Sequence, residues 1–149
     1  MKMLVCTDGS EQSQRVLEEA LRIAEGCKPE DVAIIHVYRP QTSAFLGMST
    51  NLTKEDITRL KKLGEEHKEE ANKILEDASR LFKQKNINAR TILEEGHPAE
   101  TILQVASEES FDMIVIGSRG IGGWGKTILG SVSNQVVQEA RNCSVVTVK

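Results

Sequence analysis

The most constraining feature of the sequence is a short apolar run that breaks abruptly into glycine. Residues 113–116 are apolar, and six of the eleven glycines of the chain then fall between residues 117 and 130. Glycine has no Cβ, so its backbone can take positive φ values and approach a ligand closely. A β-branched run, a glycine-rich loop and a helix together form the usual phosphate cradle of α/β proteins. The stretch therefore favours an α/β fold with an anion site at this strand end.

The rest of the chain alternates between apolar runs and helical stripes. Strands are expected at residues 1–7, 31–38, 88–94, 112–117 and 144–148, and helices at residues 10–26, 53–84, 98–106 and 131–140. This order predicts one domain over residues 1–149. It is a doubly wound, five-stranded parallel sheet with helices on both faces, which is a Rossmann-like α/β fold. The more polar run 88–94 indicates a sheet edge, and residues 39–56 are expected to include a variable surface loop.

Two of the expected helices have a predicted inner face. The long helix carries small and apolar residues at spacings of three and four, which could form a coiled-coil seam or pack on a sheet: Ile57, Leu60, Gly64, His67, Ala71, Ile74, Ala78 and Leu81. Glycine, histidine and alanine make a weak seam, so packing on the sheet is favoured. In the last helix, Val132, Val136 and Val137 are expected to face inward.

Composition narrows the classes of function. Aromatic residues make up 3% of the chain and the net charge is −3, which argues against a nucleic-acid-binding protein. The three cysteines show no C-x-x-C spacing, so neither a disulfide framework nor a zinc site is expected. No run approaches the roughly 18 apolar residues of a membrane span. We therefore expect a cytoplasmic protein that contacts neither membranes nor nucleic acids.

Three glycine patterns overlap between residues 117 and 131. Gly120, Gly122 and Gly125 read G-x-G-x-x-G, but a dinucleotide fingerprint belongs after the first strand and needs an acidic residue downstream. Gly120 to Thr127 also matches G-x-x-x-x-G-K-T, the Walker A pattern, yet no aspartate follows Asp112 to serve as its metal ligand. The third pattern, G-x2-G-x9-G-S, is therefore preferred.

The third pattern, G-x2-G-x9-G-S, assigns a structural role to each of its glycines. Gly117 ends the strand, Gly120 keeps the loop low, and Gly130 starts a helix. Backbone N–H groups and the hydroxyls of Ser131 and Ser133 would then point at an anion, helped by the helix dipole. The alternative is that these glycines only shape a tight loop without a ligand.

A second residue cluster is expected at the same place. Asp8 follows the first strand, and ligands of doubly wound sheets bind at the carboxyl ends of strands where the strand order reverses. If the first and fourth strands are neighbours, Asp8 and Gly117 face one crevice. His36 is expected to be a core histidine with a satisfied ring, and His97 to lie at a helix cap or on the surface.

The chain resembles the universal stress protein family over nearly its whole length. The resemblance rests on LVCTDGS at residues 4–10, IIHVY at 34–38, GHPAETI at 96–102, DMIVIGSRG at 112–120, LGSVSNQVV at 129–137 and CSVVTVK at 143–149. The G-x2-G-x9-G-S pattern is the specific element, because it marks the ATP-binding members of that family.

The resemblance implies an ATP site, with AMP as an alternative ligand and Mg²⁺ or Mn²⁺ as companions of the phosphates. Asp8 would hold the ribose, while Cys6, Thr7 and the backbone of Val37 would line the adenine pocket. The family commonly has proline or a small apolar residue at position 6. The ribose and phosphates would be contacted by Gly117, Ser118, Arg119, Gly120, Gly130, Ser131, Val132 and Ser133, and Lys126 could add a further contact.

The family also implies a homodimer in which the last strands pair edge to edge. The expected function is regulation of a stress response through nucleotide occupancy, with no catalytic residue assigned. Two alternatives stay open, a weak ATPase or phosphotransferase and a nucleotide-free dimeric adaptor.

Overall fold

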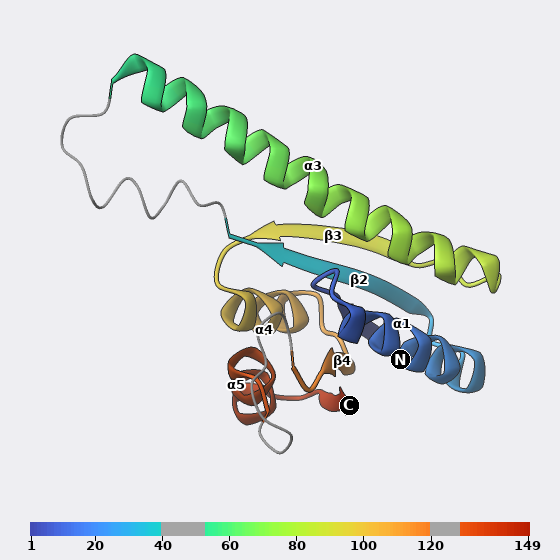
Figure 1. The fold of residues 1–149 in the computed structure, drawn as a ribbon. Helices are drawn as coiled ribbons and strands as arrows, with labels where there is room; N and C mark the ends of the chain where they lie inside the picture. Colours follow the sequence, from blue (N-terminus) through green and yellow to red (C-terminus); the bar gives the residue numbers. More distant parts are fainter. Residues whose placement is uncertain (40–52, 120–128) are drawn as a thin grey trace.

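The structure, a computed structural model, describes residues 1–39, 53–119 and 129–149. These form a five-stranded parallel sheet in the order β3-β2-β1-β4-β5 (Figure 1). The strands are β1 (Lys2–Cys6), β2 (Asp31–Tyr38), β3 (Arg90–Glu95), β4 (Met113–Gly117) and β5 (Ser144–Val148). The predicted doubly wound sheet is confirmed, and β3 lies at an edge as expected. The strand order reverses on either side of β1, where β1 pairs with both β2 and β4.

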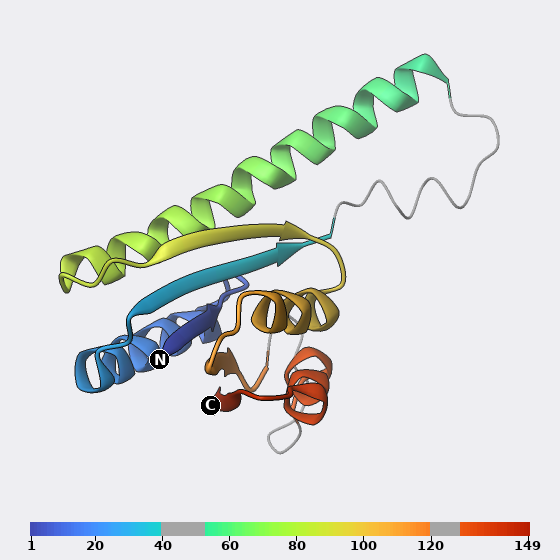
Figure 2. The same ribbon diagram turned by 180° about the vertical axis from the view of Figure 1, so that it is seen from behind.

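Helices cover both faces of the sheet. They are α1 (Glu11–Cys27), α3 (Lys54–Gln84), α4 (Pro98–Glu108) and α5 (Ser131–Glu139). One core cluster joins α1 and α3 to the sheet around Val5, Val16 and Phe82. A second cluster joins α4 and α5 to the opposite face around Leu4, Ile102 and Val136 (Figure 2). The three inner strands β1, β2 and β4 are therefore buried on both sides, which explains the lack of polar alternation in their sequences.

The helices begin in two different ways. The hydroxyl of Ser10 caps α1 by accepting a hydrogen bond from the N–H of Ser13. Thr53 and Asp56 form a capping box at the start of α3. By contrast, α4 begins after His97 and α5 begins after Gly130 without a side-chain cap. The first-turn N–H groups of α4 and α5 thus have no side-chain acceptor from a cap residue.

The long helix α3 packs on the sheet along only half of its length. Its buried residues all belong to the second half: Ala71, Leu75, Ala78 and Phe82. In the first half Ile57 is 43% exposed, and this half extends past the ends of β2 and β3 in both views (Figures 1 and 2). The prediction that the whole stripe packs on the sheet is therefore wrong, because the helix is much longer than the strands that it covers.

Two further expectations need adjustment. Val136 is fully buried, but Val137 is 43% exposed, so the inward orientation predicted for Val137 is wrong. Of the loop expected at residues 39–56, residues 40–52 lie outside the described part of the chain, and Lys54–Asp56 are helical. Among the described helices, none is both long and apolar enough to cross a membrane.

An ion-pair network lies at the amino-terminal end of the strands, opposite the end where ligands bind in such folds. The guanidinium of Arg90 donates to Oδ1 of Asp31 at 3.1 Å, to Oδ2 of Asp31 at 3.0 Å, and to the carboxylate of Glu109. It also lies 5.4 Å from the ring centroid of Phe111. The Arg90 guanidinium lowers the pKa of the Asp31 carboxyl below its ordinary value.

Candidate nucleotide-binding site

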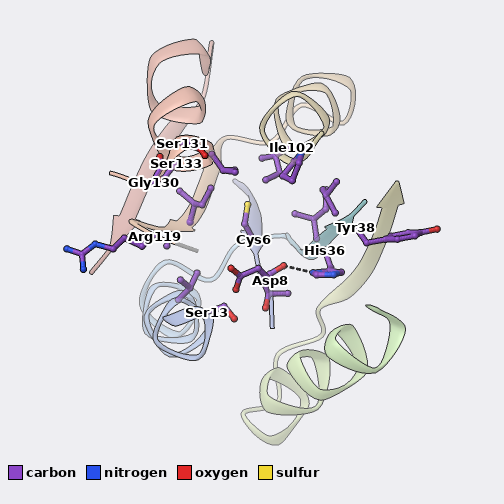
Figure 3. Close-up of a pocket in the computed structure, with 18 residues that line it drawn as sticks. Cys6, Asp8, Ser13, His36, Tyr38, Ile102, Arg119, Gly130, Ser131 and Ser133 are labelled. Carbon is purple, nitrogen blue, oxygen red and sulfur yellow. Dashed lines mark hydrogen bonds between the residues drawn. The ribbon is translucent and has the colours of Figure 1, made fainter. Parts of the chain in front are cut away.

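A cavity of about 480 Å³ opens at the carboxyl ends of β1 and β4, where the strand order reverses. Its volume lies within the range of roughly 300–1,000 Å³ typical of small-molecule sites. The first turns of α1, α4 and α5 contribute Ser13, Pro98 and Ser131 to its lining (Figure 3). The predicted meeting of Asp8 and Gly117 in one crevice is confirmed, since both line this cavity.

One side of the cavity, here called the apolar wall, belongs to the core cluster beneath α4 and α5. It consists of Cys6, Ile35, Val37, Ile102, Ile116 and Val132. Burial raises the pKa of the Cys6 thiol far above its ordinary value, so the thiol stays neutral. The apolar wall can therefore bury a flat, uncharged ring by the hydrophobic effect.

The middle of the cavity carries a carboxylate on a tightly folded loop. Asp8 follows β1, and its Oδ1 accepts hydrogen bonds from the N–H (3.0 Å) and the hydroxyl of Ser10. Gly9 has a φ of +75°, and a Cβ at this residue would lie 2.6 Å from Cδ1 of Ile74 on α3. The Asp8 loop thus turns through a conformation that favours glycine while α3 packs against it.

His36 supports the same loop from β2. Its Nδ1 lies 2.8 Å from the carbonyl oxygen of Thr7, and its side chain is buried. A carbonyl oxygen only accepts hydrogen bonds, so Nδ1 carries the proton. The prediction of a satisfied core histidine is confirmed. His97 is exposed at the start of α4, as expected.

The opposite side of the cavity, here called the phosphate end, is formed by Gly117, Gly130, Ser131 and Ser133. A Cβ on Gly117 would lie 2.9 Å from the carbonyl oxygen of Arg119, so the chain needs glycine to turn this closely. The carbonyl oxygen of Ser118 accepts from the N–H of Gly130 at 2.7 Å. These contacts hold the end of β4 against the start of α5, whose dipole favours an anion at this point.

Arg119 contributes to the lining, but its orientation differs from that of the serines. In Figure 3 its guanidinium points away from Cys6 and Asp8. Its Nε is buried and has no hydrogen-bond partner in the described part of the chain. An unpaired buried donor on a cation is unfavourable, so an anion within reach of this side chain would be stabilised.

Ten of the twelve predicted site residues line the cavity: Cys6, Thr7, Asp8, Val37, Gly117, Arg119, Gly130, Ser131, Val132 and Ser133. Ser118 is buried beside it and makes backbone contacts rather than lining it. Gly120 lies outside the described residues, as does the rest of the Walker A match up to Thr127, including Lys126.

Eight lining residues were not predicted: Ser13, Val16, Ile35, His36, Tyr38, Pro98, Ile102 and Ile116. Two of them could have been found from helix-start signals. Ser13 lies one turn into the helix capped by Ser10, and Pro98 marks the start of α4. Both helices follow the carboxyl ends of strands, which is where the crevice forms. Among the described residues, no group of three or more His, Cys, Asp or Glu could hold a metal ion.

Comparisons with known proteins agree with this fold. All of the chain, residues 1–149, matches the sequence model of the Universal stress protein family. Universal stress protein YxiE of Bacillus subtilis is 38% identical over 151 aligned residues, which cover 99% of this chain and 98% of YxiE. The structure of the universal stress protein UspA from Lactobacillus plantarum superimposes with a TM-score of 0.81 at 22% identity, covering 100% and 97% of the two chains.

Other structures of similar fold contain adenine nucleotides. The universal stress protein from Archaeoglobus fulgidus in complex with dAMP has a TM-score of 0.66 and 24% identity, with 100% and 98% of the chains covered. A universal stress protein in complex with cAMP has a TM-score of 0.64 at 21% identity, covering 99% and 95%. A family member from Arabidopsis thaliana with AMP bound has a TM-score of 0.66 at 18% identity, covering 100% and 92%. The match over the full chain and the close bacterial relative together show that this chain belongs to the universal stress protein family.

Proposed function

We propose that this chain binds an adenine nucleotide, ATP in particular, in the cavity between β1 and β4. The observation that carries the proposal is the gradient along the cavity, from the apolar wall through the Asp8 carboxylate to the uncapped start of α5. A nucleotide has the same order of chemistry, from a flat base through a ribose to phosphates. The dAMP, cAMP and AMP complexes of similar fold support the class of ligand.

Each part of the ligand has a matching group in the cavity. The base would pack against the apolar wall and approach the backbone of Val37 beside Cys6 and Thr7. The Asp8 carboxylate would accept hydrogen bonds from the ribose hydroxyls, since its two oxygens offer about four acceptor positions. The phosphates would lie at the phosphate end, within reach of first-turn N–H groups of α5. Ser118, Arg119 and Gly120 belong to the segment that would pass along them.

The start of α5 fits an anion better than the starts of α1 and α3. At α1 and α3 a side chain of the capping residue accepts a hydrogen bond from a first-turn N–H. At α5 the capping residue is Gly130, which has no side chain to offer. Phosphate oxygens could therefore occupy the acceptor position that a cap would fill. Mg²⁺ or Mn²⁺, if bound, would be coordinated mainly by the phosphates.

We further propose that nucleotide occupancy is a regulatory signal, and that the chain acts as a homodimer in the cytoplasm. β5 is an edge strand, and Val145, Val146 and Val148 are each only partly buried, so pairing with a second β5 would protect this edge. None of the three cysteines forms a disulfide, which fits a reducing compartment. Sedimentation of the purified protein tests the dimer, since a monomer at micromolar concentration would refute it.

Calorimetric titration of nucleotide-stripped protein with ATP, and separately with AMP, tests the ligand. We expect saturable binding with one site per chain, and Asp8→Asn to weaken both ligands by a similar factor of about 10–100, because both carry the ribose and one charged acceptor is lost. Failure of the parent protein to bind either nucleotide would refute the proposal and favour the nucleotide-free adaptor. The same variant tests the weak-ATPase alternative. If the protein hydrolyses ATP and Asp8 is catalytic, Asp8→Asn should lower turnover more than it lowers affinity, whereas equal losses would make Asp8 a binding residue only.

A further inference from the structure

The start of α5 is held from inside by the hydroxyl of Ser133. The Ser133 Oγ lies 2.9 Å from the carbonyl oxygen of Ser118 and 3.0 Å from that of Gly130. The side chain is 2% exposed. Ser131, two residues earlier, is exposed, and its hydroxyl makes no hydrogen bond within the described part of the chain. The two serines of the phosphate end are therefore in different chemical situations.

We infer that Ser133 is a positioning residue that aims the start of α5 at the phosphates, and that Ser131 supplies the hydroxyl that faces the ligand. The inference rests on the proposed function. It gives different roles to the two hydroxyls, which the sequence alone does not distinguish. A hydroxyl has one proton to donate. Both neighbours of the Ser133 Oγ are carbonyl oxygens, which only accept, so that proton is already committed. Phosphate oxygens also only accept, so Ser133 cannot donate to a phosphate while it holds these carbonyls.

This arrangement replaces a helix cap without using the groups that a ligand needs. A serine at the capping position would accept from a first-turn N–H, as Ser10 does at α1. Ser133 instead donates to carbonyls, so it fastens the helix start while consuming no N–H group. The N–H of Gly130 also donates to the Ser118 carbonyl, at 2.7 Å, so this oxygen accepts two hydrogen bonds from the start of α5. The N–H groups at the start of α5 are thereby fixed in direction and left for an anion.

The contact also reaches the last strand of the sheet. The N–H of Ser118 donates to the carbonyl of Val148 at 2.7 Å. Ser118 thus joins the ends of β4 and β5 to the start of α5. Loss of the Ser133 hydroxyl leaves the Ser118 carbonyl with one hydrogen bond fewer, and it frees α5 to tilt relative to β4. Phosphate contacts should suffer more than base or ribose contacts, because only the phosphate end is touched.

The test compares ATP and AMP binding by calorimetry in the parent chain, Ser133→Ala, Ser133→Thr and Ser131→Ala, with thermal unfolding of each. We expect Ser133→Ala to lower the melting temperature and to weaken ATP about fivefold more than AMP, the factor expected for one net hydrogen bond. Ser133→Thr keeps the hydroxyl and should restore the ATP-to-AMP ratio. Ser131→Ala should weaken ATP by a similar factor without changing the melting temperature.

Three outcomes would overturn the inference. An unchanged ATP-to-AMP ratio in Ser133→Ala would leave the residue merely structural. An unchanged melting temperature with weakened ATP would make Ser133 a direct ligand. Ser133→Val, which matches threonine in shape but has no hydroxyl, is the control for Ser133→Thr. If Ser133→Val restores the ATP-to-AMP ratio as well as Ser133→Thr does, shape rather than the hydroxyl matters. Binding of neither nucleotide by the parent chain would refute the proposed function itself, and with it the role of Ser133 toward phosphates.

Discussion

Replacing Gly117 with alanine should both destabilise the fold and weaken nucleotide binding. The added Cβ would lie 2.9 Å from the carbonyl oxygen of Arg119 and 3.3 Å from Cγ2 of Val16. The first of these atoms is backbone, so it can move only if the chain after β4 moves. Overpacking of this kind costs about 1–3 kcal/mol. For a chain of this length, 1 kcal/mol corresponds to roughly 3 °C, so the melting temperature should fall by about 3–9 °C.

Gly26→Ala is the matched control for this substitution. A Cβ on Gly26 would meet no atom within 4 Å, and the residue lies in the last turn of α1. Alanine should therefore stabilise the protein by up to about 0.5 kcal/mol. Thermal unfolding of both variants, followed by titration with ATP, measures the contrast. A Gly117→Ala protein as stable as the parent, with unchanged affinity for ATP, would refute the close turn at the end of β4.

Two further predictions test the packing of α3 on the sheet and the ion pair between Asp31 and Arg90. Phe82→Ala should cost about 3–5 kcal/mol in urea unfolding because Phe82 is fully buried, whereas Ile57→Ala should cost less than about 0.5 kcal/mol because Ile57 is exposed; similar losses would contradict the half-packed α3. The Asp31 pKa is lowered by Arg90, so this pair stabilises the fold above the ordinary carboxyl pKa of about 3.9 and loses that effect as the pH falls through the lower folded value. Stability should therefore fall more steeply below about pH 4 in the parent than in Arg90→Leu, and parallel pH curves would exclude the effect.

Local patterns were sufficient to predict the order of strands and helices and the crevice shared by Asp8 and Gly117. The buried strands carry continuous apolar runs, and the helices carry apolar residues at helical spacing, so each element could be predicted without tertiary information. The meeting of Asp8 and Gly117 followed from a general rule about where parallel strands end. The resemblance to a known family added the residue-level roles, which stay a prediction for this chain.

The two wrong predictions, for the α3 stripe and for Val137, arose because a local sequence pattern does not show which of its residues meet the sheet. The stripe from Ile57 to Leu81 continues unchanged along α3, but this pattern does not indicate where the sheet beneath the helix ends. At 1.5 Å per residue the helix is roughly 46 Å long, while the eight residues of β2 span roughly 26 Å. Val137 was misplaced because neighbouring valines in a short helix differ by 100° in direction, and the sequence does not say which one meets the core.

The role that we propose for Ser133 was also beyond sequence reasoning. Gly130-Ser131-Val132-Ser133 offers two hydroxyls, and either could meet a phosphate. Only the three-dimensional contact with the Ser118 carbonyl, fifteen residues earlier, distinguishes them. The cavity residues of α1 and α4 were missed for a related reason, since Val16 and Ile102 look like ordinary core positions within their helices.

The unsupported half of α3 has a consequence for how this helix holds together. An isolated helix must first form a nucleus, which is unfavourable by a factor of roughly a thousand. In α3 the buried residues from Ala71 to Phe82 supply that nucleus, so the outer turns need only propagate from it. The capping box at Thr53 opposes fraying at the far end. The outer half can thus unwind and rewind while the domain stays folded, and its amide hydrogens should exchange with solvent long before those of the inner half.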